Sequence, residues 1–208
     1  MIKVYGHPNS RSTRVVWALE EADAAYSYTK VDLFKGEGRK PPYVDLNPAG
    51  KVPALVDDDD LVITESAAIC TYIAEKFPAA ELIPPLDHPR NRAEYFRWCF
   101  FALSELEQPL WTIAKHRFAL PEDKRVPAII DTAIWEFSQQ TKVLEKHLYE
   151  REFAVGNHFT VADILIAHTL AWARSAKVPL GHATLEHYAD QMLSRPALHR
   201  AKQREQGA

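Results

Sequence analysis

Two short segments in the first third of the sequence carry hydroxyl groups where they could bind an anion. The first is the run PNSRSTR at residues 8–14, which leads into a helical pattern. The second is Glu65-Ser66, which stands between an apolar run and another helical pattern. The first N–H groups of a helix lack partners and bear partial positive charge, so they attract anions. The same residues could instead cap their helices, which is reason enough for serine there.

A third segment, NPAGKVP at residues 47–53, leads into a short apolar strand. Its two prolines and its glycine predict a backbone that leaves its own hydrogen-bonding groups exposed. Such a backbone offers an edge to which an extended peptide can add. An ordinary proline at the start of a strand is the alternative.

The elements that must hold these segments begin with a strand at Ile2–Tyr5, which Gly6 ends. The apolar residues of Ser12–Ala24 fall on one helical face, and Tyr26–Val31 has the composition of a second strand. Strand, helix and strand within about 30 residues form a βαβ unit, which implies parallel strands and a right-handed crossover.

Residues 35–51 are rich in Gly, Pro and charge, which predicts an irregular connection with at most a short helix. Strands follow at 53–56 and 61–64, joined by the four aspartates at 57–60, and a helix is predicted at 65–76. The acidic run lacks the alternating spacing and the distal Glu of a calcium loop. A solvated hairpin turn is therefore its interpretation.

Beyond Pro78 a proline-rich stretch predicts a linker at 79–88, and the strand signals then largely stop. Helices are predicted at 90–115 and 123–149, from about Thr160, at 185–193 and after Pro196. The predicted domains are residues 1–78 and 89–208.

Composition narrows the class of protein. The 208 residues carry a net charge of −3, which argues against a generally basic nucleic-acid binder. No apolar run has the roughly 18 residues of a membrane span, so no membrane partner is expected. The two cysteines fall in helical patterns and are predicted to be packed. Because nothing in the sequence resembles a disulfide framework, a reduced cytoplasmic setting is expected. The histidines show no ligand spacing, so no metal is expected.

The segments at 8–14, 47–53 and 65–69, in this chain order, and the later run FTVAD at residues 159–163 resemble the glutathione transferase superfamily over nearly the whole chain. The similarity is to serine-type, bacterial-like cytosolic members. It implies an α/β plus all-α fold class: a thioredoxin-like N-terminal domain followed by an all-helical C-terminal domain. Glutathione would be the co-substrate, and a homodimer is expected.

The resemblance also assigns the glutathione site. Pro53 would be cis, and the main chain of Val52 would pair with the cysteinyl backbone of glutathione. Ser66 would bind the γ-glutamyl carboxylate and Glu65 the ammonium group. Lys51 would pair with the glycyl carboxylate.

Two further parts of the site stay open. Lys40 or Arg39 could take the place of Lys51. The acceptor substrate would lie between the domains, and three aromatic residues are candidates for its wall by position: Trp111, Phe118 and Trp172.

The family must present a thiolate, and the resemblance points to Ser10 as the group that stabilises it. Serine-type members place this residue two after a proline and four before an arginine, which Ser10 satisfies relative to Pro8 and Arg14. Tyrosine-type members would have their tyrosine where this chain has Gly6. Tyr5 is one step earlier and would face the other side of the strand.

Other residues compete with Ser10. Ser12 or Thr13 could contact the thiol if the loop geometry differs, and Asn9 could donate from its amide. A cysteine-type mechanism would need a cysteine at Arg11. Without a C-x-x-C pair, the chain cannot run dithiol exchange through its own cysteines.

Thr160 and Asp163 have the form of a capping box, which we interpret as structural.

The resulting hypothesis is a transferase that directs the glutathione thiolate to a small hydrophobic electrophile. The alternatives are a glutathione-dependent disulfide reductase and a non-catalytic assembly module.

Overall fold

The computed structural model describes residues 1–58 and 60–207, and the chain falls into two compact units. One comprises Met1–Ile83 with Ser194–Ala208, and the other comprises Pro84–Leu193. Each unit is described by itself. The domain ranges expected from the sequence, 1–78 and 89–208, are a separate division of the chain and stay a prediction.

The first unit is built on a four-stranded sheet in the order β2-β1-β3-β4. Its strands are β1 (Ile2–Gly6), β2 (Tyr26–Lys30), β3 (Ala54–Val56) and β4 (Val62–Thr64). β1 and β2 are parallel, whereas β3 pairs antiparallel with both β1 and β4. The predicted βαβ unit is therefore present, and the predicted fold class is confirmed.

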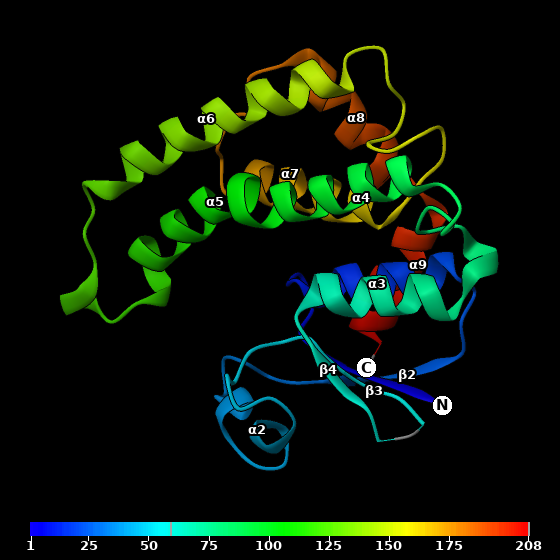
Figure 1. Ribbon diagram of the computed structural model, residues 1–208. Helices are drawn as coiled ribbons and strands as arrows, with labels where there is room; N and C mark the ends of the chain where they lie inside the picture. Colours follow the sequence, from blue (N-terminus) through cyan, green and yellow to red (C-terminus); the bar gives the residue numbers. More distant parts are fainter. Residues whose placement is uncertain (59, 208) are drawn as a thin grey trace. The chain divides into compact units, whose positions relative to one another are not determined.

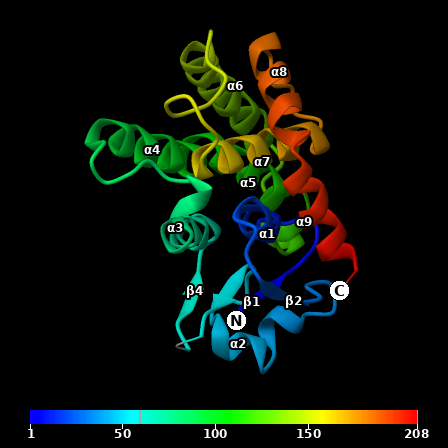
Figure 2. The ribbon, with the colours of Figure 1, turned by 90° about the vertical axis from the view of Figure 1, so that its right-hand side faces the viewer.

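Three helices pack beside this sheet: α1 (Ser12–Glu21), α3 (Ser66–Lys76) and α9 (Pro196–Gln206). α1 lies between α3 and α9, above the strands (Figures 1 and 2). In β1 the side chains alternate, with Ile2 and Val4 buried and Lys3 exposed. On the helix side, Trp17 and Leu19 of α1 are fully buried. This alternation buries one apolar row of the sheet under the helices.

A separate apolar cluster forms where the chain leaves β2 and returns to β3. Tyr43, from the short helix α2 (Tyr43–Leu46), is buried there with Val31 and Ala54, and Tyr5 packs against them. A 3₁₀ turn, η1 (Glu37–Arg39), precedes α2. The segment expected to be irregular thus contains one short helix, which agrees with the prediction.

The β3–β4 connection is a tight hairpin turn, in which Asp60 N–H donates to the Asp57 carbonyl over 3.0 Å. The buried Asp57 side chain accepts hydrogen bonds from Tyr72 and Lys76 of α3, and these bonds hold its pKa below the usual value. Asp57 therefore ties the turn to α3, which explains one aspartate of the acidic run. Asp59 lies outside the described residues.

The second unit is helical. Its helices are α4 (Pro89–Phe101), α5 (Glu107–Ala114), α6 (Ile129–Leu148), α7 (Val161–Ser175) and α8 (Ala183–Leu193). Among these five helices, α7 contains the longest buried stretch, and it contacts α4, α5 and α8. The short 3₁₀ turns η2 (Pro78–Ala80) and η5 (Glu122–Lys124) lie at the end of the first unit and before α6.

The helix predicted at 90–115 is interrupted by wide turns. π-helical turns occupy η3 (Ala102–Leu106) and η4 (Lys115–Ala119), so the helical stretch runs from Pro89 to Ala119. Pro109 has no N–H to give the carbonyl four residues earlier, inside η3. A π turn there accommodates the missing hydrogen bond.

The helix predicted at 123–149 begins later than expected. α6 starts at Ile129, two residues after Pro127. A proline is tolerated near a helix start but not in its interior, so the prediction that ran through Pro127 was wrong at this end.

Within the described residues, no helix combines the length and the apolar character needed to cross a membrane. Cys70 and Cys99 are both buried, and burial raises the pKa of the Cys99 thiol to about 12. Their predicted packing role agrees with this burial.

The capping box at the start of α7 is formed. Asp163 is fully buried and accepts hydrogen bonds from the Thr160 N–H at 2.8 Å and the Thr160 hydroxyl at 3.0 Å. Its other oxygen accepts from the Ala154 N–H and the Tyr188 hydroxyl, each at 2.7 Å. One carboxylate therefore joins the cap of α7 to the preceding loop and to α8.

We predict that Thr160→Ala lowers the free energy of unfolding by about 1 kcal/mol through loss of the cap. Asp163→Ala should cost several times more, because it leaves buried donors unpaired at about 1–3 kcal/mol each. Urea unfolding measures both changes, with Thr160→Ser as the control that keeps the hydroxyl. Glutathione affinity of the folded fraction should stay nearly unchanged. A large affinity loss without destabilisation would refute the structural role.

Candidate functional site

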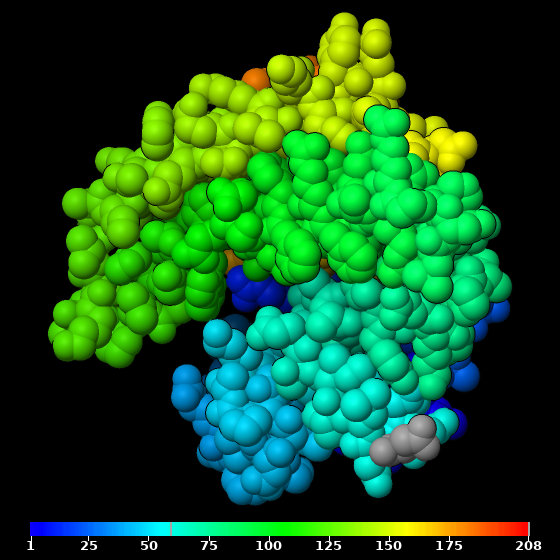
Figure 3. Space-filling model, in the orientation of Figure 1, coloured from blue at the N-terminus to red at the C-terminus, as the bar shows by residue number. Residues whose placement is uncertain are grey.

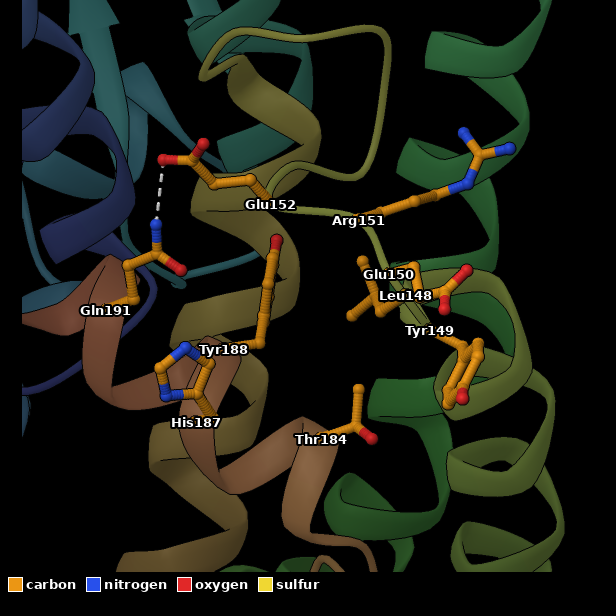
Figure 4. Close-up of a pocket in the computed structure, with 9 residues that line it drawn as sticks. All are labelled: Leu148, Tyr149, Glu150, Arg151, Glu152, Thr184, His187, Tyr188 and Gln191. Carbon is orange, nitrogen blue, oxygen red and sulfur yellow. Dashed lines mark hydrogen bonds between the residues drawn. The ribbon is translucent and has the colours of Figure 1, made fainter.

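The helical unit contains a cavity of about 520 Å³ bordered by residues 148–152 and by α8 (Figure 4). Some of the polar side chains around it are bound to protein. Tyr188 donates to the buried Asp163, and Gln191 donates to Glu152 over 2.9 Å. None of the motifs singled out in the sequence lines this cavity, so the candidate site is sought in the first unit.

A smaller pocket in the first unit brings together the three segments singled out in the sequence. Its lining is Arg11, Asn47, Lys51, Val52, Pro53, Glu65 and Ser66. The segment around α2 and the segment of β4 and α3 border each other on the face shown in Figure 3. All five residues predicted to bind glutathione thus line one pocket. Arg39 and Lys40 are not among its lining residues.

Two side chains form hydrogen bonds with the loop before Pro53. The Lys51 carbonyl accepts hydrogen bonds from the Tyr43 hydroxyl and from the Asn47 amide, the latter at 2.7 Å. Val52-Pro53 is a cis peptide bond, as the resemblance implied. The ladder of β3 with both neighbours begins at Ala54, so Val52 lies outside the sheet pairing. The Val52 backbone is therefore placed at the pocket as an unpaired strand edge.

The start of α3 forms the other wall. Glu65 precedes the helix with φ 67°, a conformation that non-glycine residues rarely adopt and that costs of order 1–3 kcal/mol. Ser66 is buried, and its hydroxyl accepts a hydrogen bond from the guanidinium of the buried Arg14 at 3.3 Å. A hydroxyl can donate as well as accept. The Ser66 hydroxyl can therefore still donate a hydrogen bond to an acceptor in the pocket.

The charges around the pocket suit a zwitterionic ligand. Arg11 and Lys51 are cationic, Glu65 is anionic, and the α3 N-terminus adds partial positive charge. Arg11 and Asn47 belong to the motifs, yet sequence reasoning did not assign them to the site. Their place in the motifs was the available signal.

Ser10 lies in the turn before α1 rather than in the pocket lining, where its neighbour Arg11 lies. Its hydroxyl donates to the His7 carbonyl at 2.6 Å and accepts from the Ser12 N–H at 3.1 Å. The Ser10 and Ser12 oxygens are 2.9 Å apart and share a hydrogen bond. The half-buried Ser10 hydroxyl is therefore fixed by both arms of its own turn.

Comparison with known proteins decides the family. The sequence matches the model of the glutathione S-transferase N-terminal domain over residues 1–75 and that of the C-terminal domain over residues 109–196. It is 30% identical to glutathione S-transferase F9 of Arabidopsis thaliana, over 95% of this chain and 94% of that protein. The chain belongs to the glutathione transferase superfamily.

Two other relatives bear on the chemistry. The chain is 29% identical to the disulfide-bond oxidoreductase YfcG of Escherichia coli, over 95% of this chain and 92% of that protein. The solved structure of a sphingomonad glutathione S-transferase complexed with glutathione is 29% identical. It superposes with a TM-score of 0.86 and covers 99% of this chain and 100% of that one.

The structure leaves no place for the tyrosine of tyrosine-type glutathione transferases. A Cβ on Gly6 would lie 2.7 Å from the Ser12 Cβ and 2.9 Å from a ring carbon of Tyr28. The Tyr5 ring instead packs 6.1 Å from the Tyr43 ring, centre to centre, in the cluster beside α2. Neither position can present a phenol to the turn before α1.

The competing residues of that turn differ in exposure. Ser12 is fully buried and accepts from the His7 N–H at 3.1 Å. The buried Thr13 hydroxyl donates to Glu205 of α9 at 2.8 Å. Asn9 is exposed, with φ 57°. Among the hydroxyls of the turn, Ser10 therefore has the most access to solvent.

The remaining candidates lie in the helical unit. Phe118 is exposed, whereas Trp111 and Trp172 are partly buried. In the part of the chain that the structure describes, no group of three or more His, Cys, Asp and Glu side chains could hold a metal ion.

We predict that Gly6→Ala lowers the urea midpoint of unfolding, at a cost of about 1–3 kcal/mol, because the new methyl group must displace Ser12 or Tyr28. Gly207→Ala is the matched control, since its Cβ would meet its nearest atom at an ordinary 3.4 Å. Equal midpoints for the two variants would contradict the prediction, because they would show that Ser12 and Tyr28 shift at little cost in free energy.

Proposed function

We propose that this protein is a glutathione transferase of the serine type, which binds glutathione in the pocket of the first unit and directs its thiolate to a small hydrophobic electrophile. The observation that carries the proposal is the convergence of Lys51, Val52, Pro53, Glu65 and Ser66 on one pocket. The glutathione complex of the sphingomonad relative supports the same ligand.

Each end of glutathione has a complementary group. The Val52 main chain pairs with the cysteinyl backbone as one added strand would. The γ-glutamyl carboxylate binds the Ser66 hydroxyl and the N–H groups of α3, and Glu65 binds the ammonium group. Lys51 and Arg11 supply the charge that pairs with the glycyl carboxylate.

Ser10 stabilises the thiolate. A thiol with a pKa of about 8.5 is only about 3% ionised at pH 7, and a shift of about 2 units needs about 2.7 kcal/mol. One hydrogen bond to a charged acceptor supplies about 1.5–3 kcal/mol, and the α1 N-terminus adds about 0.3–1 kcal/mol. The Ser10 hydroxyl makes this bond by turning from the His7 carbonyl to the thiolate, while the Ser12 N–H still holds its oxygen.

Disulfide reduction with glutathione as the thiol source is a second candidate, favoured by the similarity to the E. coli disulfide-bond oxidoreductase. The proposal also includes a homodimer in the cytoplasm. A panel of electrophiles and mixed disulfides, assayed with glutathione, separates the two reactions.

The binding prediction is tested by calorimetry with glutathione. Wild type should bind, and Ser66→Ala should bind about tenfold more weakly or worse, because one charge-assisted hydrogen bond is lost. Ser104→Ala, at an exposed serine of η3, is the matched control and should bind as wild type does. Absence of binding by wild type would favour the assembly module.

The role of Ser10 is tested by titrating the thiolate absorbance of bound glutathione. Ser10→Ala should raise the thiol pKa by about 1–2 units. Ser12→Ala should have a smaller effect, because Ser12 acts through the orientation of Ser10. A thiol pKa that Ser10→Ala leaves unchanged would remove Ser10 from this role and reopen Asn9 and Thr13.

A further inference from the structure

A buried carboxyl group lies beneath the first turn of α1. Glu205, near the end of α9, is only 2% exposed, and one of its oxygens accepts the Thr13 hydroxyl at 2.8 Å. The two residues are 192 positions apart in the sequence. A carboxyl group buried to this degree is uncommon and needs a reason.

Ion pairs align α9 with α1 and bring Glu205 to this place. Arg195 binds both carboxylate oxygens of Glu21, at 2.6 and 2.9 Å. Arg200 binds the Glu20 side chain at 2.9 Å and its carbonyl at 2.8 Å. These contacts lie at the end of α1, whereas Glu205 contacts Thr13 at its start, so α9 runs antiparallel to α1.

Among the described residues, the second carboxylate oxygen of Glu205, Oε1, lacks a hydrogen-bond partner like that of the first. Within the described residues, Glu205 Oε1 and the Tyr28 hydroxyl are buried and make no hydrogen bond with protein. Burial raises the pKa of Glu205 to about 7, against the lowering effect of the Thr13 hydrogen bond and the Lys202 charge. Burial, and then the Glu205 charge, also raise the pKa of Tyr28. The carboxyl group therefore changes its charge near neutral pH.

Thr13 links this carboxyl group to the proposed thiol site. Its side chain binds Glu205, and its N–H donates to the Ser10 carbonyl at 3.1 Å. Ser12, directly before Thr13, holds the Ser10 oxygen through its own N–H. Thr13, which donates to Glu205, and the Ser10 hydroxyl thus belong to one hydrogen-bonded turn.

We propose that Glu205 is a positioning residue for Ser10, held to it through Thr13, and that its carboxyl charge opposes ionisation of the thiol bound above it. The inference rests on the proposed function. The groups that face Glu205 are Thr13 of α1, Tyr28 of β2 and Lys202 of α9 itself. On the far side of the turn, His7 is the titratable neighbour of Ser10. Below the carboxyl pKa the site carries one negative charge less, which favours the thiolate.

The link to the turn is tested without glutathione, by following backbone amide NMR shifts of Ser10 and Thr13 against pH. Wild type should show a titration near pH 7 at both amides. Glu205→Gln keeps an oxygen acceptor for Thr13 but cannot titrate, so this titration should vanish while any contribution from His7 remains. A titration that survives in Glu205→Gln, or that wild type lacks, overturns the link.

The effect on the thiol is tested with bound glutathione, and the two parts of the proposal predict opposite signs. Thr13→Val removes the hydroxyl link and should raise the thiol pKa by about 1 unit, which is tenfold less thiolate at neutral pH. Glu205→Gln removes the opposing charge and should lower the thiol pKa. Thr132→Val, at an exposed threonine of α6, is the control and should change nothing.

Equal thiol pKa values in all variants, or shifts of the same sign in Thr13→Val and Glu205→Gln, overturn the proposal. Failure of wild type to bind glutathione is a different result, since it overturns the proposed function and the thiol part with it. The amide titration still decides whether Glu205 acts on the Ser10 turn.

Discussion

The pocket depends on a buried positive charge. Arg14 is fully buried in α1 and donates to the Ser66 hydroxyl at the start of α3. A buried guanidinium is tolerated only where hydrogen-bond acceptors surround it, so its position constrains the starts of both helices. The starts of both helices therefore lie near the loop that carries Val52 and Pro53, where Arg11 precedes α1 and Ser66 begins α3.

Rigid and strained elements combine around this pocket. Two side chains hold the Lys51 carbonyl, which positions the strand edge at Val52. Glu65 adopts an unfavourable positive φ directly before α3, where its side chain borders the pocket. Such conformations persist where the surrounding structure enforces them, and they are concentrated at ligand sites. The arrangement agrees with a site organised before its ligand arrives.

Much of the first unit could be predicted from the sequence, because its signals are local. The alternation in β1, the helical face of α1 and the proline and glycine around residues 47–53 each act over a few residues. The long helices were harder to delimit. Helical periodicity continues through Pro109 and Pro127, but each proline removes a backbone donor, which widens one helix into a π turn and delays the start of another.

The sequence by itself determined the family resemblance, the order of the elements and five of the seven residues that line the pocket, since these depend on short motifs with fixed spacing. Only the tertiary structure showed that Gly6 has no room for a side chain and that Ser12 and Thr13 point into the interior. It also placed Glu205 beneath α1. These facts depend on contacts between residues far apart in the chain, and the periodicity of one helix does not specify which other helix packs against it.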